Sequence, residues 1–198
     1  MATLDLQVGA SLSDCYVYVV NTSSPPHTWT SIDLSSTAIA FGELGTNRFG
    51  MGVRFTNVTL LGTDTINVAY LTFNPDQTQS GVVVRSNIYG EDANNAAAFS
   101  TVADFNGRAQ TAAVTYDNVG TWTLDTAVNT VSIVTPVTTI KNRAGWVSGN
   151  AMVFMIEDNN SDNEAHRRAD TYDGSPSTLA AKLHIEYTAG GGQTYSLD

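Results

Sequence analysis

Two short segments of the sequence are rich in side chains whose oxygen atoms bind hard cations. Residues 91–95 read EDANN, and residues 157–162 read EDNNSD. Ca²⁺ takes about six to eight oxygen ligands, which closely spaced carboxylates and amides can supply. Each segment follows a run of strand character, so we expect the two to meet at one rim of the fold. The candidate ligands of a structural Ca²⁺ are Glu91, Asp92, Asn94, Glu157, Asp158 and Asp162.

A solvated acidic loop is the alternative interpretation of both segments. Neither has the ligand spacing of an EF-hand, so the pattern alone does not identify a calcium site. His166, Arg167 and Arg168 come soon after the second segment. We expect these three cationic or titratable side chains to balance its negative charge as a structural ion-pair cluster.

Glu91 and Glu157 are also the residues to consider for acid catalysis. Glycoside hydrolysis needs two carboxyl groups that face each other, one of them with a raised pKa. The asparagine-rich surroundings of Glu91 and Glu157 suggest no pocket that would remove water from either carboxyl group. The sequence also contains no Gly-x-Ser-x-Gly nucleophile elbow. We therefore expect no enzymatic activity.

Aromatic side chains outside the strand pattern are candidates for stacking on sugars. Trp29 follows the proline-containing loop at residues 24–26, and Tyr172 lies in the segment TYDGSP. We expect these two rings at the surface, where they could bind a glycan. The alternative for each is packing in the core, which is the commoner use of large aromatic residues.

The charge of the chain argues against two classes of partner. The formal net charge is -10, the isoelectric point is about 4.4, and only Lys141 and Lys182 are lysines. Nucleic acids and anionic membranes are bound by clusters of lysine and arginine, so we expect neither as a partner. Cys15 is the one cysteine and is expected to be a buried apolar residue.

The pattern of apolar residues predicts an all-β fold, an antiparallel β-sandwich of jelly-roll type with one short helix. The run at residues 48–60 predicts a strand with a bend near Thr56, which forms a meander pair with residues 65–73. Residues 151–156 are apolar on both faces, as in a central strand. Residues 183–188 alternate and predict the last strand.

The expected helix covers residues 136–143, with Thr135 as its cap and Pro136 at its first position. A helical turn is also expected at residues 96–99. We predict one domain over residues 1–188, with a loosely patterned part at 1–44, and a flexible tail at residues 189–198.

Three segments together resemble the DNRLRE-type sandwich domains and the related carbohydrate-binding-module-like domains of phage particles and secreted bacterial enzymes. They are GTNRFGMGVRFTNVTLLGTDTINVAYLTF, TTIKNRAGWVSGNAMVFMI and PSTLAAKLHIEYT, within residues 45–188. The resemblance implies that the strand after the first turn begins a second sheet. The arginine-rich signature of such domains is reduced here to Arg48 and Arg54.

We therefore expect a non-catalytic structural protein of a bacteriophage virion: a capsid decoration, head-fibre or tail-associated sandwich that forms homo-oligomers or joins other subunits. The first fifteen residues have no basic start and no long apolar run, so we expect no signal peptide. Phage proteins are made in the host cytoplasm and leave by lysis, which fits that expectation. The alternative is a carbohydrate-binding module of a secreted protein.

Overall fold

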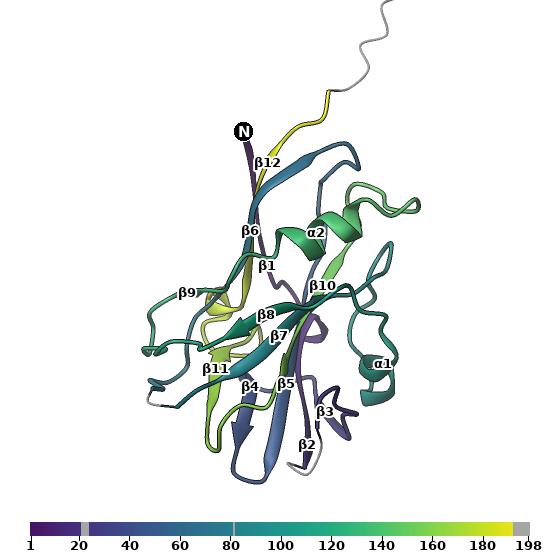
Figure 1. The fold of residues 1–198 in the computed structure, drawn as a ribbon. Coiled ribbons are helices and arrows are strands. Elements are labelled where there is room, and N and C mark those ends of the chain that lie inside the picture. The colour runs from purple at the N-terminus through teal and green to yellow at the C-terminus, as the bar shows by residue number, and fades with distance from the viewer. Residues whose placement is uncertain (21–23, 81, 192–198) are drawn as a thin grey trace, which may run out of the picture.

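Two antiparallel β-sheets form the body of the protein, which confirms the prediction of an all-β sandwich (Figure 1). The computed structural model describes residues 1–20, 24–80 and 82–191. The smaller sheet has four strands in the order β1-β12-β6-β9. The larger sheet has eight strands. Six follow the order β11-β4-β5-β10-β7-β8, β2 pairs with β5, and β3 pairs with β2.

The strands form where β-branched and aromatic residues are concentrated, and turns separate these runs along the chain. The smaller sheet contains β1 (Ala2–Gln7), β6 (Thr65–Phe73), β9 (Val128–Asn129) and β12 (Lys182–Thr188). The larger sheet contains β2 (Asp14–Val20), β3 (Ser31–Asp33), β4 (Ala38–Leu44), β5 (Asn47–Phe55), β7 (Arg85–Gly90), β8 (Val114–Asp117), β10 (Met152–Asp158) and β11 (His166–Asp170). The helices are α1 (Val102–Gly107) and α2 (Val134–Lys141), with single 3₁₀ turns at Ser11–Ser13 and Ser177–Leu179.

The main core lies between the sheets and follows the two-residue period of the strands. On β12, Leu183 and Ile185 are fully buried, and on β10 Phe154 and Ile156 belong to the same cluster. Successive side chains of a strand point to opposite faces, so the residues between these lie on the other side of each sheet. The predicted central and final strands are confirmed.

A second core covers the outward side of the larger sheet and explains why β10 is apolar on both faces. Val153 and Met155 point away from the main core and are fully buried. Trp29, Phe99 and Phe105 come from loops and from α1 to cover them. Cys15 belongs to this core and is buried, as expected.

Two glycines of β5 allow these covering rings to approach the sheet. A Cβ atom at Gly52 would lie 2.4 Å from the ring of Phe99, and one at Gly50 would lie 2.8 Å from the ring of Trp29. Any other residue type at Gly50 or Gly52 would therefore push the rings of Trp29 and Phe99 away from β5.

One expectation about neighbouring elements is wrong. β5 and β6 do not form a meander pair, because β5 belongs to the larger sheet and β6 to the smaller. The turn between them crosses from one sheet to the other, as the resemblance implied. The bend expected near Thr56 is present: β5 ends at Phe55, and Asn57 has a φ of 58°.

The helices also differ from the prediction. α2 begins after Ile133, so Thr135 lies inside the helix and does not cap it. Residues 96–99 form no helical turn, and a second helix, α1, begins after Thr101 instead. The Thr101 side chain accepts a hydrogen bond from the backbone N–H of Asp104 at 3.0 Å, an N-cap that the sequence analysis did not identify.

The C-terminal prediction falls largely outside the described residues, since 192–198 are not among them. No helix in the described part of the chain is long and apolar enough to span a membrane.

Candidate functional site

The two acidic segments lie at opposite ends of neighbouring strands. β7 and β10 are antiparallel, with Gly90 opposite Phe154 and Ser86 opposite Asp158. The first segment follows Gly90, whereas the second begins at the far end of β10. A strand rises about 3.3 Å per residue, so the two lie roughly 15 Å apart along the sheet. The expectation that they meet at one rim is wrong.

Arginines from distant parts of the chain hold the first segment. The Glu91 carboxylate accepts a hydrogen bond from Arg108 at 2.5 Å. Asp92 forms an ion pair with Arg143, whose Nε also donates to Oδ1 of Asn94 at 2.8 Å. Burial raises the pKa of Glu91, and the charge of Arg108 acts in the opposite direction. The three predicted ligands thus serve as partners of arginine.

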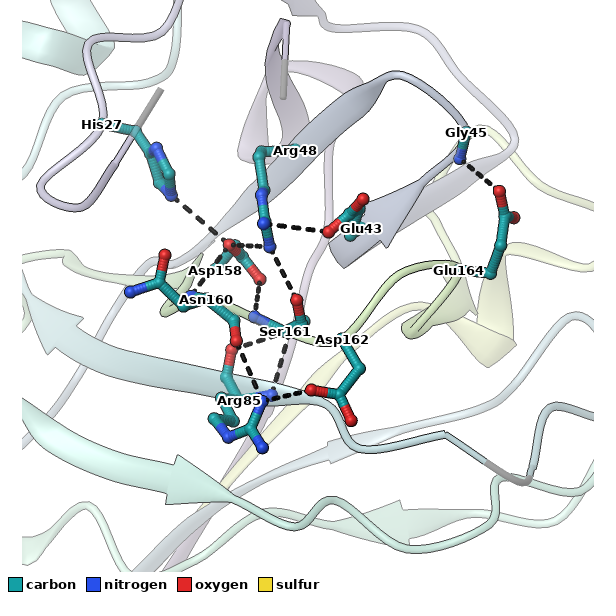
Figure 2. A network of polar contacts seen from close by, with 10 residues as sticks. All are labelled: His27, Glu43, Gly45, Arg48, Arg85, Asp158, Asn160, Ser161, Asp162 and Glu164. Atoms are coloured by element: carbon teal, nitrogen blue, oxygen red, sulfur yellow. Dashed lines mark hydrogen bonds and ion pairs between the residues drawn. The ribbon is translucent and has the colours of Figure 1, made fainter. Parts of the chain in front are cut away.

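Asp158 is the centre of a polar network at the second segment (Figure 2). Its carboxylate accepts hydrogen bonds from Arg48 at 3.0 Å and from the backbone N–H groups of Asn160 and Ser161 at 3.1 and 3.0 Å. The Nε2 atom of His27 lies 3.4 Å away. Burial acts to raise the pKa of Asp158, but the donors outweigh it and the pKa lies below its usual range.

A second arginine holds the turn that follows. Arg85 contacts Asp162 at 2.6 Å and the carbonyl of Asn160 at 3.0 Å (Figure 2). Within residues 1–20, 24–80 and 82–191, no group of three histidine, cysteine, aspartate or glutamate side chains is placed to hold a metal ion. Calcium binding stays a prediction. Because the two segments lie apart, it now concerns each segment separately and not a site shared by both.

The residues expected to balance the second segment have other partners. Arg167 donates to the carbonyls of Val119 and Gly120 at 2.8 and 2.9 Å, and Arg168 pairs with Asp76 at 2.8 Å. That expectation is wrong: Arg48 and Arg85 hold the segment instead. Both come from strands that are far away in sequence, so spacing along the chain could not identify them.

Glu157 differs from its acidic neighbours because it lies in the second core. Its side chain accepts a hydrogen bond from Gln110 Nε2 at 2.7 Å. Burial raises its pKa to about 7, and the hydrogen bond from Gln110 acts in the opposite direction. The expectation that no desolvating pocket surrounds this carboxyl group is wrong. It borders a hollow of about 210 Å³, whose other lining residues are Pro26, His27, Trp29, Phe105, Asn106, Arg108 and Gln110.

This hollow presents one carboxyl group. Glu91 does not line the hollow, although it contacts Arg108, which is one of the lining residues. Glycoside hydrolysis needs two carboxyl groups that flank the bond to be cleaved. One acts as the general acid, and the other acts as the nucleophile or the general base. The pair Glu91 and Glu157 therefore does not share a cleft.

The two rings proposed for sugar binding are not surface platforms. Trp29 is 3% exposed and packs in the second core, with its ring centroid 5.0 Å from that of His27. Tyr172 is half-buried against the main core, and its backbone N–H donates to Asp14 at 2.8 Å. The alternative of packing describes both residues.

A cluster of exposed and half-buried aromatic and aliphatic side chains was missed by the sequence analysis. We define the aromatic patch as Tyr16, Tyr18, Val20, Leu44 and Phe49. The rings of Tyr16, Tyr18 and Phe49 lie pairwise 6.0 Å apart. Val20 and Leu44 are 57% and 38% exposed.

The register of β2 and β5 builds this patch. Tyr18 lies directly opposite Phe49, and Tyr16 shares its face of the strand because it is two residues away. Two hollows of about 240 Å³ each share Tyr16 and Phe49 as lining residues. The alternation of tyrosine with Cys15 and Val17 was a visible signal, since it places both tyrosines opposite a buried face.

Comparisons with known proteins identify no relative. No family model matches the chain, and no curated protein matches it in sequence. The resemblance to DNRLRE-type and carbohydrate-binding-module-like domains therefore stays a prediction.

Proposed function

We propose that the protein is a non-catalytic structural protein that assembles with further copies of itself through the aromatic patch. The observation that carries this proposal is the grouping of three rings and two exposed aliphatic side chains on β2, β4 and β5. In the part of the chain that the structure describes, these residues have an open surface beside them, formed by the two shared hollows.

The composition of the patch suits a protein interface. Interface centres are enriched in tyrosine and other aromatic residues and depleted of charged ones. Tyrosine also supplies large contact area with few rotatable bonds, and such residues often contribute most of the binding energy. The rim is polar: Asn47 lines one hollow and Arg168 the other.

The charge of the molecule favours contact at this place over others. A net charge of -10 makes two copies repel each other wherever acidic surfaces meet. None of the five residues of the aromatic patch is charged, so two copies can meet there with less repulsion.

We place this assembly in a bacteriophage virion. The support comes from the sequence: the resemblance to sandwich domains of phage particles and the low lysine content. Exposed sheet edges are often protected by lysine, and in a particle neighbouring subunits can cover them instead.

Sedimentation equilibrium between about 1 and 100 µM tests the assembly. The wild-type chain should form a discrete oligomer, and the double variant Tyr18→Ser, Phe49→Ser should weaken it at least about tenfold, because buried interface aromatics contribute about 2 kcal/mol or more. Val147→Ser is the matched control, since Val147 is 62% exposed but lies outside the patch. A monomeric wild type, or equal effects of both variants, would contradict the proposal.

The virion is tested separately. Mass spectrometry of gradient-purified particles from the phage that encodes this chain should detect it in the particle fraction. Its presence only in the soluble lysate would exclude a structural role in the virion while leaving self-assembly open to the first experiment.

A further inference from the structure

β1 (Ala2–Gln7) is the outermost strand on one side of the smaller sheet. In the part of the chain that the structure describes, β12 is the only strand that pairs with it. An edge strand presents a row of backbone N–H and C=O groups that can pair with another chain. Proteins commonly guard such an edge with lysine or proline, and residues 1–13 contain neither. The open edge of β1 is therefore a candidate interaction surface.

The hydrogen-bond pattern of β1 determines which of its residues serve this edge. The backbone N–H of Val8 donates to the carbonyl of Ala181 at 3.0 Å, which extends the register of β1 with β12 by one residue. Bonded and non-bonded pairs alternate along an antiparallel ladder. The even-numbered residues of β1, such as Leu4, thus direct their backbone groups toward β12. The odd-numbered residues, Thr3 and Asp5 among them, direct theirs toward the open edge.

The side chains of β1 leave apolar surface at the same edge. Leu4 and Leu6 turn inward and pack against the main core, whereas Thr3 and Asp5 are exposed on the outward face. Both leucines are only half-buried, because β1 is the end of its sheet. A strand added beyond β1 would remove more of their apolar surface from water, which favours association.

The one charged side chain of β1 is directed away from the open edge. Oδ1 of Asp5 lies 2.7 Å from Nδ1 of His184 on β12. The His184 ring is itself stacked on that of Tyr70, with ring centroids 4.7 Å apart. The Asp5 carboxylate is therefore held on the β12 side of its strand, where it does not cover the edge.

A second copy of β1 matches this edge by symmetry. About a two-fold axis, two antiparallel copies contact each other through the same residues. Inward leucines must lie opposite inward residues of the other copy, so the axis passes through a residue and not between two residues. Only an axis at Leu4 or at Asp5, the two central residues of the strand, overlaps most of β1.

Charge decides between these two axes. An axis at Asp5 places two carboxylates directly opposite each other, which is unfavourable. An axis at Leu4 instead places Thr3 of each copy opposite Asp5 of the other, so that a hydroxyl can donate to a carboxylate. It also makes Thr3 and Asp5 the hydrogen-bonded pairs, which fits the direction of their backbone groups.

We propose that β1 pairs antiparallel with β1 of a second copy about a two-fold axis at Leu4, which joins the two smaller sheets into one continuous sheet. This interface goes beyond the aromatic patch, which lies on β2, β4 and β5 of the larger sheet. Neither interface requires the other. Together they give each subunit two separate surfaces for self-association, as a larger assembly needs.

Cysteine crosslinking tests the register. The two copies of Leu4 form a non-hydrogen-bonded pair, whose Cα atoms lie about 4.5 Å apart, within the range of disulfide geometry. Leu4→Cys should therefore form a covalent dimer under mild oxidation, seen on a non-reducing gel. Leu6→Cys is the matched control, because Leu6 is half-buried on the same face but lies opposite Ala2 of the other copy. Its two copies are roughly 13 Å apart along the strands, so it should form no covalent dimer.

A proline variant tests whether backbone pairing holds the dimer. The N–H of Thr3 faces the open edge, so Thr3→Pro removes a hydrogen bond to the second copy and none to β12. It should weaken the dimer at least about tenfold in sedimentation equilibrium. Thr3→Val is the control, since it keeps both the N–H and a β-branched side chain. Both changes are made in the Tyr18→Ser, Phe49→Ser variant, which removes the aromatic patch, and thermal melts check that each chain is folded.

Three results would overturn the proposal. One is a monomeric Tyr18→Ser, Phe49→Ser variant at every concentration up to about 100 µM. The others are equal crosslinking of Leu4→Cys and Leu6→Cys, and equal dissociation constants for folded Thr3→Pro and Thr3→Val. Failure of the aromatic patch would leave the β1 dimer intact, so the two interfaces are judged separately.

Discussion

The outward faces of the two sheets differ in what covers them. On the smaller sheet, Tyr70 and His184 stand over an open hollow of about 420 Å³. On the larger sheet, Met155 of β10 faces the same way relative to its own sheet but is fully buried beneath Trp29 and Phe99. One face is built to meet solvent or a ligand, and the other is built to be closed.

The same strand period therefore has two outcomes, decided by the residues on the outward side. β12 alternates apolar with polar residues, and its polar row is exposed or half-buried. β10 has no such alternation until Glu157, so a second layer of loops must cover it. That layer also covers Glu157, whose pKa burial raises to about 7. A carboxyl group on the closed face thus changes its acidity, which the sequence position alone does not reveal.

Of the changes that compare the closed face with the open one, removal of the Trp29 side chain should have the largest effect on the free energy of unfolding. Trp29→Ala opens the second core and should lower the free energy of unfolding by about 3–5 kcal/mol, the usual cost of truncating a buried large aromatic residue. Tyr70→Ala on the open face should cost only about 1 kcal/mol, mainly the stacking with His184. Urea denaturation of both variants measures the difference. Equal losses would mean that the two faces are equally buried in solution.

Two arginines that contact the second acidic segment, Arg48 and Arg85, allow a buried ion pair to be compared with an exposed one within a single loop. Arg48→Met should lower the free energy of unfolding by about 3 kcal/mol, because it removes a cation from Asp158 and Glu43, whose side chains are 0% and 3% exposed. Arg85→Met should have a much smaller effect, since its pair with Asp162 is solvated. Thermal melts at two salt concentrations distinguish them, because salt should weaken only the exposed pair. A larger loss for Arg85→Met would refute this assignment.

Glu157 gives the closed face a pH dependence. Its pKa rises from about 4.5 unfolded to about 7 folded, so folding favours the protonated form. This contribution is fully present below about pH 4.5 and is lost as the pH rises through about 7, with a total of at most about 3 kcal/mol. Glu157→Gln should flatten the stability profile over that range in urea melts.

Asp14 should account for part of the remaining slope. Burial raises its pKa from 3.8 to about 7, which gives a loss of stability in the same direction as the pH rises. Adding Asp14→Asn to Glu157→Gln should therefore flatten the profile further. An unchanged slope in the double variant would show that neither group is buried as described.

The sequence was sufficient where structure depends on local period. β6, β10 and β12 were predicted because their apolar residues recur within single strands. The pairing of β5 with β6 was wrong because membership of a sheet is set by distant strands, here β10 and β2 for β5 and β12 for β6. No local pattern records that choice.

The sites were harder to predict for the same reason. Glu91, Asp92, Asp158 and Asp162 were recognised as acidic clusters, but the arginines that neutralise them lie 17 to 110 positions away in the sequence. Trp29 beside a proline loop suggested exposure, and only the folded chain brings Gly50 beneath its ring. The smaller sheet likewise joins residues from both ends of the chain, with β1 beside β12.

Calcium should produce the smallest effect of all. Asp158 already accepts hydrogen bonds from Arg48 and two backbone N–H groups, and Asp162 pairs with Arg85, so a cation would compete with arginine at either residue. Excess chelator should therefore lower the melting temperature by less than about 2 °C, below about 1 kcal/mol for a chain of this length. A drop of more than about 5 °C that Ca²⁺ reverses and Mg²⁺ does not would show that these carboxylates bind calcium. In that case the acidic segment would resemble the open face of the smaller sheet in being accessible from solvent, and not the closed face of the larger sheet.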